Sequence, residues 1–180
     1  KVAFTIEEAR ESGADIVVCY YHWGEEYQRS PNLWQERIAK ETVAMGADII
    51  FASHPHVLQS VEVLKNEVTG KEVPVFYSMG NFLSNQRAET LNNRYTEQGM
   101  IARVNLQYDS TTGEVALVGT DAMRTWLDKY KSGGKDVYAI VPLDSELEDN
   151  EALKASGHLH RAMQASEDVE AVLGSDYIWR

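Results

Sequence analysis

The sequence predicts an α/β fold, in which a parallel helix–strand–helix–strand unit precedes mainly antiparallel strands and a C-terminal helical tail. Three observations predict it. A helical pattern, Gly-Ala-Asp, an apolar run and a histidine follow one another twice, within residues 6–22 and 31–54. Later, two alternating segments flank Thr111-Thr112-Gly113, which is typical of an antiparallel hairpin. Residues 151–173 then favour helix.

Composition limits the class of protein. The 180 residues are 43% hydrophobic and 25% charged, which is ordinary for one globular domain. The net charge of −11 argues against nucleic acid or an anionic membrane surface as a partner. No apolar run approaches the roughly 18 residues that span a bilayer. The single cysteine, Cys19, excludes an internal disulfide, and its apolar neighbours predict a buried small side chain.

The first half of the chain contains two predicted helices, each followed by a strand. Thr5-Ile6-Glu7-Glu8 has the form of a capping box, so a helix is expected over residues 6–12, with Gly13 ending it. Residues 15–21 form an apolar run typical of a strand buried on both faces. Ser30-Pro31 predicts the second helix start. Gly46 ends this helix, residues 48–52 form the next strand, and the predicted buried helix face is Trp34, Ile38, Thr42 and Met45.

Histidines follow both of these strands. Parallel strands joined by one helix end at the same edge of the sheet, so His22 should lie beside His54 and His56. Pro55 should hold His54 extended, which turns both imidazoles of the pair to the same side. Neutral imidazoles presented together are common metal ligands, although a lone histidine such as His22 can simply cap a strand end. Glu26 could orient an imidazole or be a solvated loop charge.

The second half favours antiparallel strands. Short strands are expected around a turn at residues 66–71 and over residues 74–78. Gly80 should allow a close backbone approach and Asn81 a hydrogen bond across the loop edge, unless the strand merely bends at the glycine. The hairpin strands are predicted at residues 100–108 and 114–120, and one more strand is predicted at residues 137–141. A loop tip is expected at residues 132–134, while the rest of residues 121–135 carries no clear pattern.

The C-terminal segment begins with an acidic, solvated stretch at residues 144–151, followed by predicted helices at 151–165 and 167–173. Gly157-His158-Leu159-His160 has the Gly-His-x-His form found in dinuclear metallophosphoesterases. Residues two apart in a helix point about 200° away from each other, so this pair cannot share a metal ion. A surface or packing role is therefore expected.

Three motifs in order carry a family resemblance. They are His22-Trp23-Gly24-Glu25-Glu26-Tyr27, His54-Pro55-His56-Val57-Leu58-Gln59 and Tyr77-Ser78-Met79-Gly80-Asn81-Phe82. The chain resembles the CapA-type poly-γ-glutamate capsule biosynthesis proteins, whose domain is related to calcineurin-like metallophosphoesterases. The resemblance implies a four-layer α/β/β/α sandwich. Residues 1–143 would be the C-terminal portion of that domain, and residues 144–180 an acidic helical tail.

The resemblance also implies roles for the site residues. His22, His54 and His56 would bind a divalent metal ion (Mn, Fe or Zn), His22 and Glu26 would be catalytic, and Trp23 and Asn81 would contact substrate. The Gly-Asp, Asn-x-Glu and Asn-Asn-His motifs that begin the family domain are missing, and Asn92-Asn93-Arg94 lacks the histidine. This segment is therefore expected to be inactive alone.

The implied function is that of a metal-dependent hydrolase in capsule biosynthesis, acting on the capsule polymer or another acidic or phosphorylated substrate. The alternative is a non-catalytic cell-surface scaffold or polymer-binding subunit of a capsule synthesis membrane complex. A homodimer could also form through an exposed sheet edge. The chain begins at Lys1 without a methionine, so we expect a longer protein that an upstream segment secretes or anchors outside the cytoplasm.

Overall fold

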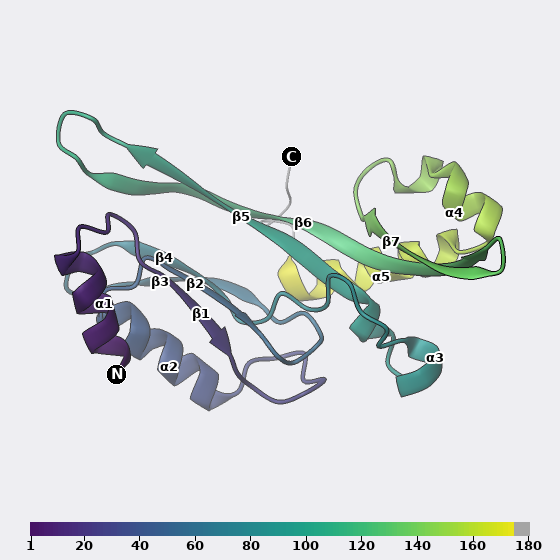
Figure 1. Cartoon of the computed structure of the whole chain (residues 1–180), viewed down its shortest axis with the longest axis horizontal. Helices are drawn as coiled ribbons and strands as arrows, with labels where there is room; N and C mark the ends of the chain where they lie inside the picture. Colours follow the sequence, from purple (N-terminus) through teal and green to yellow (C-terminus); the bar gives the residue numbers. More distant parts are fainter. Residues whose placement is uncertain (175–180) are drawn as a thin grey trace.

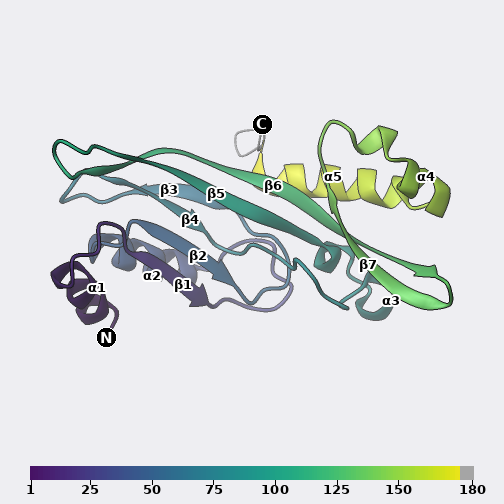
Figure 2. The same ribbon diagram turned by 45° about the horizontal axis from the view of Figure 1, so that its top comes forward.

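A computed structural model describes residues 1–174, which form a mixed α/β body with two sheets (Figures 1 and 2). The N-terminal sheet has four strands in the order β1-β2-β4-β3. Strand β2 pairs in parallel with β1 and β4, and β3 pairs antiparallel with β4. These strands are β1 (Val18–His22), β2 (Ile49–Ser53), β3 (Val61–Lys65) and β4 (Glu72–Phe76).

Two helices, α1 (Val2–Glu11) and α2 (Leu33–Ala44), lie on one face of this sheet (Figure 1). Helix α1 begins four residues earlier than predicted, because the Thr5 hydroxyl donates back to the Lys1 carbonyl instead of capping a helix start. Helix α2 begins after Asn32, whose side chain and that of Gln35 exchange hydrogen bonds with each other's backbone. The prediction of Ser30 as the cap was therefore wrong by two residues.

The buried face of α2 confirms the prediction at Thr42 and differs from it elsewhere. Trp34 is 50% exposed and Met45 is exposed as well, whereas the buried residues are Gln35, Ala39, Thr42 and Val43. The small Ala39 side chain allows the helix to lie close to the sheet, and Trp34 instead makes an edge contact with Trp23, with ring centroids 6.3 Å apart. The apolar periodicity placed the face about one residue away from its true position.

The prediction that β1 is buried on both faces was wrong, because Val18 and Tyr20 on one face are 50% and 62% exposed. Within residues 1–174, β1 is an edge strand that pairs only with β2. Cys19 is half-buried rather than fully buried. The apolar run reflects only one covered face, the face that meets α1 and α2.

The second sheet has three antiparallel strands in the order β5-β6-β7. They are β5 (Gln98–Tyr108), β6 (Val115–Ser132) and β7 (Lys135–Pro142), and the predicted turns at residues 111–113 and 132–134 are confirmed. Strand β6 runs without a break through the region that carried no clear pattern. The sequence of β6 does not alternate between apolar and polar residues here, because residues 124–128 are buried on both faces of the strand.

The C-terminal residues form η2 (Leu147–Asp149), α4 (Glu151–Ser156) and α5 (Leu159–Leu173), after the short α3 (Ala88–Leu91) and η1 (Arg94–Glu97). The predicted helix over 151–165 breaks at Gly157, whose φ of +75° ends α4, and the second predicted helix is the end of α5. His158 bonds to the buried Asp128 and His160 is exposed, as the predicted surface or packing role requires. Residues 175–180 of the predicted tail lie outside the described residues.

Both the first sheet and α5 pack on the same face of the second sheet. Met100, Ala122 and Trp126 share one apolar cluster with Phe76 of β4 and with Val169 of α5. On the opposite face, Ile101 is 39% exposed. Helix α5, which belongs to the predicted tail, packs along β6 (Figure 2), and the four-layer sandwich that the resemblance implied stays a prediction.

Candidate metal centre

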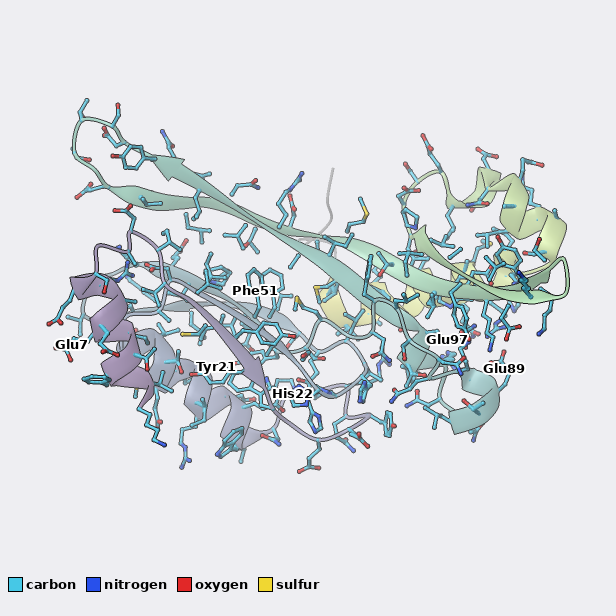
Figure 3. The ribbon with its side chains drawn as sticks, viewed as in Figure 1. Glu7, Tyr21, His22, Phe51, Glu89 and Glu97 are labelled. Carbon is cyan, nitrogen blue, oxygen red and sulfur yellow. The ribbon has the colours of Figure 1, made fainter. Side chains whose placement is uncertain are left out.

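The three predicted histidines lie together at the carboxyl ends of β1 and β2. His22 is the last residue of β1 and is in register with Ser53 of β2, so the chain that follows β2 passes directly beside it. The ring centroids of His22 and His54 are 4.5 Å apart, and those of His54 and His56 are 6.2 Å apart. Figure 3 shows His22 at this end of the sheet. The convergence expected from parallel topology is confirmed.

The backbone of the histidine pair is strained, and the prediction of an extended conformation was wrong. His54 has φ +113° and His56 has φ +60°, values that residues other than glycine rarely adopt. Such residues cost on the order of 1–3 kcal/mol each and persist only where the surroundings hold them. Two backbone hydrogen bonds hold this loop: the Tyr27 amide donates to the Pro55 carbonyl at 2.8 Å, and the Trp23 amide donates to the Ser53 carbonyl at 3.1 Å.

Asn81 fixes the protonation of the His56 ring. The Asn81 amide nitrogen donates to the Thr96 carbonyl at 2.9 Å, so its oxygen Oδ1 is the atom that faces His56 Nδ1, at 3.1 Å. A carbonyl oxygen can only accept, and therefore Nδ1 of His56 carries the hydrogen. In the neutral ring the lone pair is then on Nε2, the atom available to a metal ion. The predicted hydrogen bond of Asn81 is confirmed, and its amide is engaged in orienting His56.

Glu26 is next to that lone pair. Its Oε1 lies 3.7 Å from His56 Nε2, and its side chain is about half exposed. A carboxylate oxygen and an imidazole lone pair are both acceptors, so a cation or a proton between them would be stabilised by both. Glu25 is exposed.

The metal-binding side chains lie in two pairs, and each pair could bind a divalent transition metal. Two imidazoles with nitrogens about 2 Å from one ion have ring centroids about 5 Å apart, close to the His22–His54 separation. His56 and Glu26 form the second pair. Within residues 1–174, no group of three or more His, Cys, Asp or Glu side chains is placed to hold one ion. These residues fit part of a metal site.

Trp23, predicted to contact substrate, lies in the core. It is 3% exposed and its indole nitrogen donates to the Tyr77 carbonyl at 2.9 Å. Its ring stacks on Tyr21, with centroids 4.6 Å apart. Trp23 therefore supports the end of β1 from behind the site.

Two buried polar residues that sequence reasoning did not assign support the loops. The fully buried Gln59 donates to the carbonyls of Gln28 and Ser30, and accepts from Gln35. The Ser78 hydroxyl donates to the Val57 carbonyl at 2.7 Å. The supporting role of Gln59 could have been inferred from its position, because it is a polar residue at the end of the second histidine motif, directly after Val57 and Leu58.

An apolar groove of about 490 Å³ opens between the two sheets beside β1. Its lining includes Tyr20, Phe51, Met79 and Met100, and no histidine. The Tyr20 hydroxyl, 2.7 Å from Ser53 Oγ, connects this groove to the start of the histidine loop. The groove and the histidine site are therefore neighbouring but separate features.

Comparison with known proteins identifies the segment that holds the site. Residues 1–86 match the family model described as "Bacterial capsule synthesis protein PGA_cap". Over these residues the chain is similar to this capsule synthesis family. His22, Glu26, His54, His56 and Asn81 all fall within the matched segment. The CapA-type resemblance is confirmed there, and the predicted domain boundary at residue 143 stays a prediction.

The names of two curated relatives both contain CapA. "Capsule biosynthesis protein CapA" of Bacillus anthracis is 46% identical over 80 residues, which are 44% of this chain and 18% of the relative. "PGA biosynthesis protein CapA" of Bacillus subtilis (strain 168) is 46% identical over 81 residues, 45% of this chain and 20% of the relative. The matched PGA_cap segment thus spans no more than a fifth of either relative. Within residues 1–174, no helix is long and apolar enough to cross a membrane.

Proposed function

We propose that this chain is part of a capsule (poly-γ-glutamate) biosynthesis protein whose PGA_cap segment contributes ligands to a divalent metal site of a hydrolase. The observation that carries the proposal is the orientation of His56. Its Nε2 lone pair points toward Glu26 because Asn81 holds Nδ1 from the other side. The paired His22 and His54 rings lie next to it.

Each residue has a role in this proposal. His22, His54 and His56 would contribute ligands, in the pairs described above, to one or two divalent metal ions (Mn, Fe or Zn), and the bound metal would supply Lewis acidity toward a phosphoryl or acyl oxygen. Asn81 keeps the His56 ring in its ligating tautomer. The exposed Glu26 carboxylate is close enough to His56 to hold a proton during hydrolysis.

The substrate in this proposal is the capsule polymer or another acidic or phosphorylated molecule, a choice supported by the names of the two relatives. Because the matched segment is at most a fifth of either relative, the missing ligands would come from other parts of a longer protein. Those parts would complete a metallophosphatase-like sandwich. A site that acts on a capsule belongs outside the cytoplasm, secreted or membrane-anchored, beside a capsule synthesis membrane complex.

Metal content tests the proposal. The double variant H54A/H56A, in the longest natural form of the protein, should lose metal uptake measured by elemental analysis after loading with Mn²⁺ or Zn²⁺. H160A is the matched control, because His160 is exposed and outside the cluster. Equal metal content in the double variant and the wild type would refute the ligand assignment.

One observation favours a second candidate, a non-catalytic scaffold or polymer-binding subunit. The described residues hold donors in pairs and supply no closed set of three. Hydrolysis assays on phosphodiesters and on poly-γ-glutamate, with and without Mn²⁺, separate the two candidates. Polymer binding without turnover, at full metal occupancy, supports the scaffold. Pairing of two copies through the exposed edge of β1 is a third candidate, and light scattering of the purified chain tests it.

A further inference from the structure

We propose that helix α5, which lies outside the matched PGA_cap segment, positions His56 through η1 and Asn81, with Asp168 as the positioning residue. This inference rests on the proposed metal site, because it explains how one of its ligands is held. Three hydrogen-bonded links connect α5 to His56: from Asp168 to η1, from η1 to Asn81, and from Asn81 to His56.

The first link joins α5 to both ends of η1. The Asp168 carboxylate accepts from Arg94 Nε at 2.7 Å and from Arg94 Nη2 at 2.9 Å. The same carboxylate accepts from Gln98 Nε2 at 3.0 Å. Arg94 begins η1 and Gln98 directly follows it, so a single side chain of α5 holds both ends of this short helix.

A second contact from α5 fixes the middle of this segment. Glu97 is 2% exposed and accepts from Arg161 of α5 at 2.9 Å and from Arg87 at 3.1 Å. The Trp126 indole donates to it at 3.2 Å. A buried carboxylate with this many donors has one stable position, so Glu97 fixes the backbone beside Thr96. Figure 3 shows Glu97 where β5 begins, close to α3.

The second link runs from η1 to Asn81. The carbonyl of Thr96 accepts from the Asn81 amide nitrogen, and the carbonyl of Gln98 accepts from the Asn81 backbone amide at 3.1 Å. Thr96 is fully buried, and its hydroxyl donates to the carbonyls of Asn93 and Gln86. Asn81 therefore takes its orientation from the two residues that flank Glu97.

The third link is the one from Asn81 to His56. If η1 shifts, the Thr96 carbonyl no longer selects the orientation of the Asn81 amide, and the amide can present nitrogen instead of oxygen to the ring. His56 would then lose the acceptor for its Nδ1 hydrogen, and the lone pair would be divided between the two ring nitrogens. A change at Asp168 should thus alter a histidine that it does not touch.

The experiment uses the full 180-residue chain with isotope-labelled histidine. Nitrogen and carbon chemical shifts at pH 8 report which ring nitrogen of neutral His56 carries hydrogen, and the signal is assigned by its absence in H56A. The wild type should show the Nδ1–H form. D168A should show a mixture of both tautomers, and zinc or cobalt affinity should fall about three- to tenfold, less than the 10- to 100-fold typical of direct partners of a ligand.

E170Q is the matched control. Glu170 lies on the same helix, is exposed and pairs with Arg124 instead of η1, so the His56 tautomer and metal affinity should be unchanged. Should D168A fail to fold, Q98M is the second variant. It removes the hydrogen bond from Gln98 to Asp168, leaves the Arg94 pair in place, and should give the same change in tautomer.

The outcomes separate this inference from the proposed function. An Nδ1–H tautomer that persists in D168A and Q98M overturns the role of α5, whatever the metal affinity. A tautomer change in a protein that binds no metal supports the role of α5 and counts against the metal site. An equal change in E170Q would show a general loosening of the helix and would also overturn the inference.

Discussion

Gly80 and Gly99 face each other in an isolated antiparallel bridge, and neither position has room for a side chain. A Cβ on Gly80 would lie 2.5 Å from the Gln98 carbonyl oxygen, and one on Gly99 would lie 2.3 Å from the carbonyl oxygen of Asn81. This contact joins the histidine-bearing sheet to the second sheet. It also sets the position of Asn81, the neighbour of Gly80.

We therefore expect G80A to lower the free energy of unfolding by about 2–4 kcal/mol. G70A is the matched control, because Gly70 has a similar φ, +73° against +68°, with nothing within 4 Å of its Cβ. Its cost should be only that of the positive φ, about 1 kcal/mol. Urea denaturation measures both. Equal losses would mean that backbone conformation, and not the close approach, determines the need for glycine at position 80.

The buried indole of Trp23 leads to a second prediction. W23F removes the hydrogen bond to the Tyr77 carbonyl and should cost about 1–3 kcal/mol of unfolding free energy, with the His22 loop retained. W34F is the control, because Trp34 is half exposed and its change should stay within about 0.5 kcal/mol of zero. If W23F abolished substrate binding in a protein of wild-type stability, Trp23 would be a substrate contact after all.

Gln59 supports the loop that carries Glu26. Q59L leaves the carbonyls of Gln28 and Ser30 without their donor, so the unfolding free energy should fall by about 2–4 kcal/mol. Limited proteolysis should also cut residues 24–31 faster. Q28L is the control, since only the backbone of Gln28 takes part and its side chain is exposed. Resistance of Q59L to proteolysis at the wild-type rate would contradict this role.

Asp168 should make part of the stability dependent on pH. Burial raises the pKa of Asp168, but hydrogen bonds from Arg94 and Gln98 outweigh that effect and hold the pKa below its usual value. A lowered pKa means that the folded state favours the carboxylate, so this stabilisation is present above about pH 4 and is lost as the pH falls through the folded pKa. D168N should be less stable than the wild type by about 1–2 kcal/mol at pH 7, and the difference should shrink progressively as the pH is lowered below about 4. A constant difference across this range would contradict the assignment.

Topology made much of the site predictable. Two predicted helices ending at Gly13 and Gly46, each followed by an apolar run with strand character, were enough to place His22 beside His54 from the sequence. Gly13 and Gly46 have φ of +91° and +101°, and glycine adopts such angles without a steric cost. Close approach at Gly80 was predictable for the same reason.

Other features depend on partners that lie far away in the sequence. The positive φ of His54 opposes the local preference before proline, and contacts from residues 23–27 hold it there. The central part of β6 shows no alternation because residues 124–128 are all buried, in the strand that α5 and η1 contact. The exposure of β1 depends on which strands lie next to it, which a single apolar run does not encode.

The apolar cluster that the two sheets share extends beyond the segment that the family model matches. The PGA_cap segment ends at residue 86, yet the side chain of Phe76 is covered by residues from β5 and β6, and Asn81 takes its acceptor from Thr96. A protein truncated at residue 86 would expose the apolar face of its sheet. Its histidine loop would also lose the Thr96 carbonyl that orients Asn81. Such a truncated product should enter inclusion bodies, whereas residues 1–174 keep both halves of the interior together.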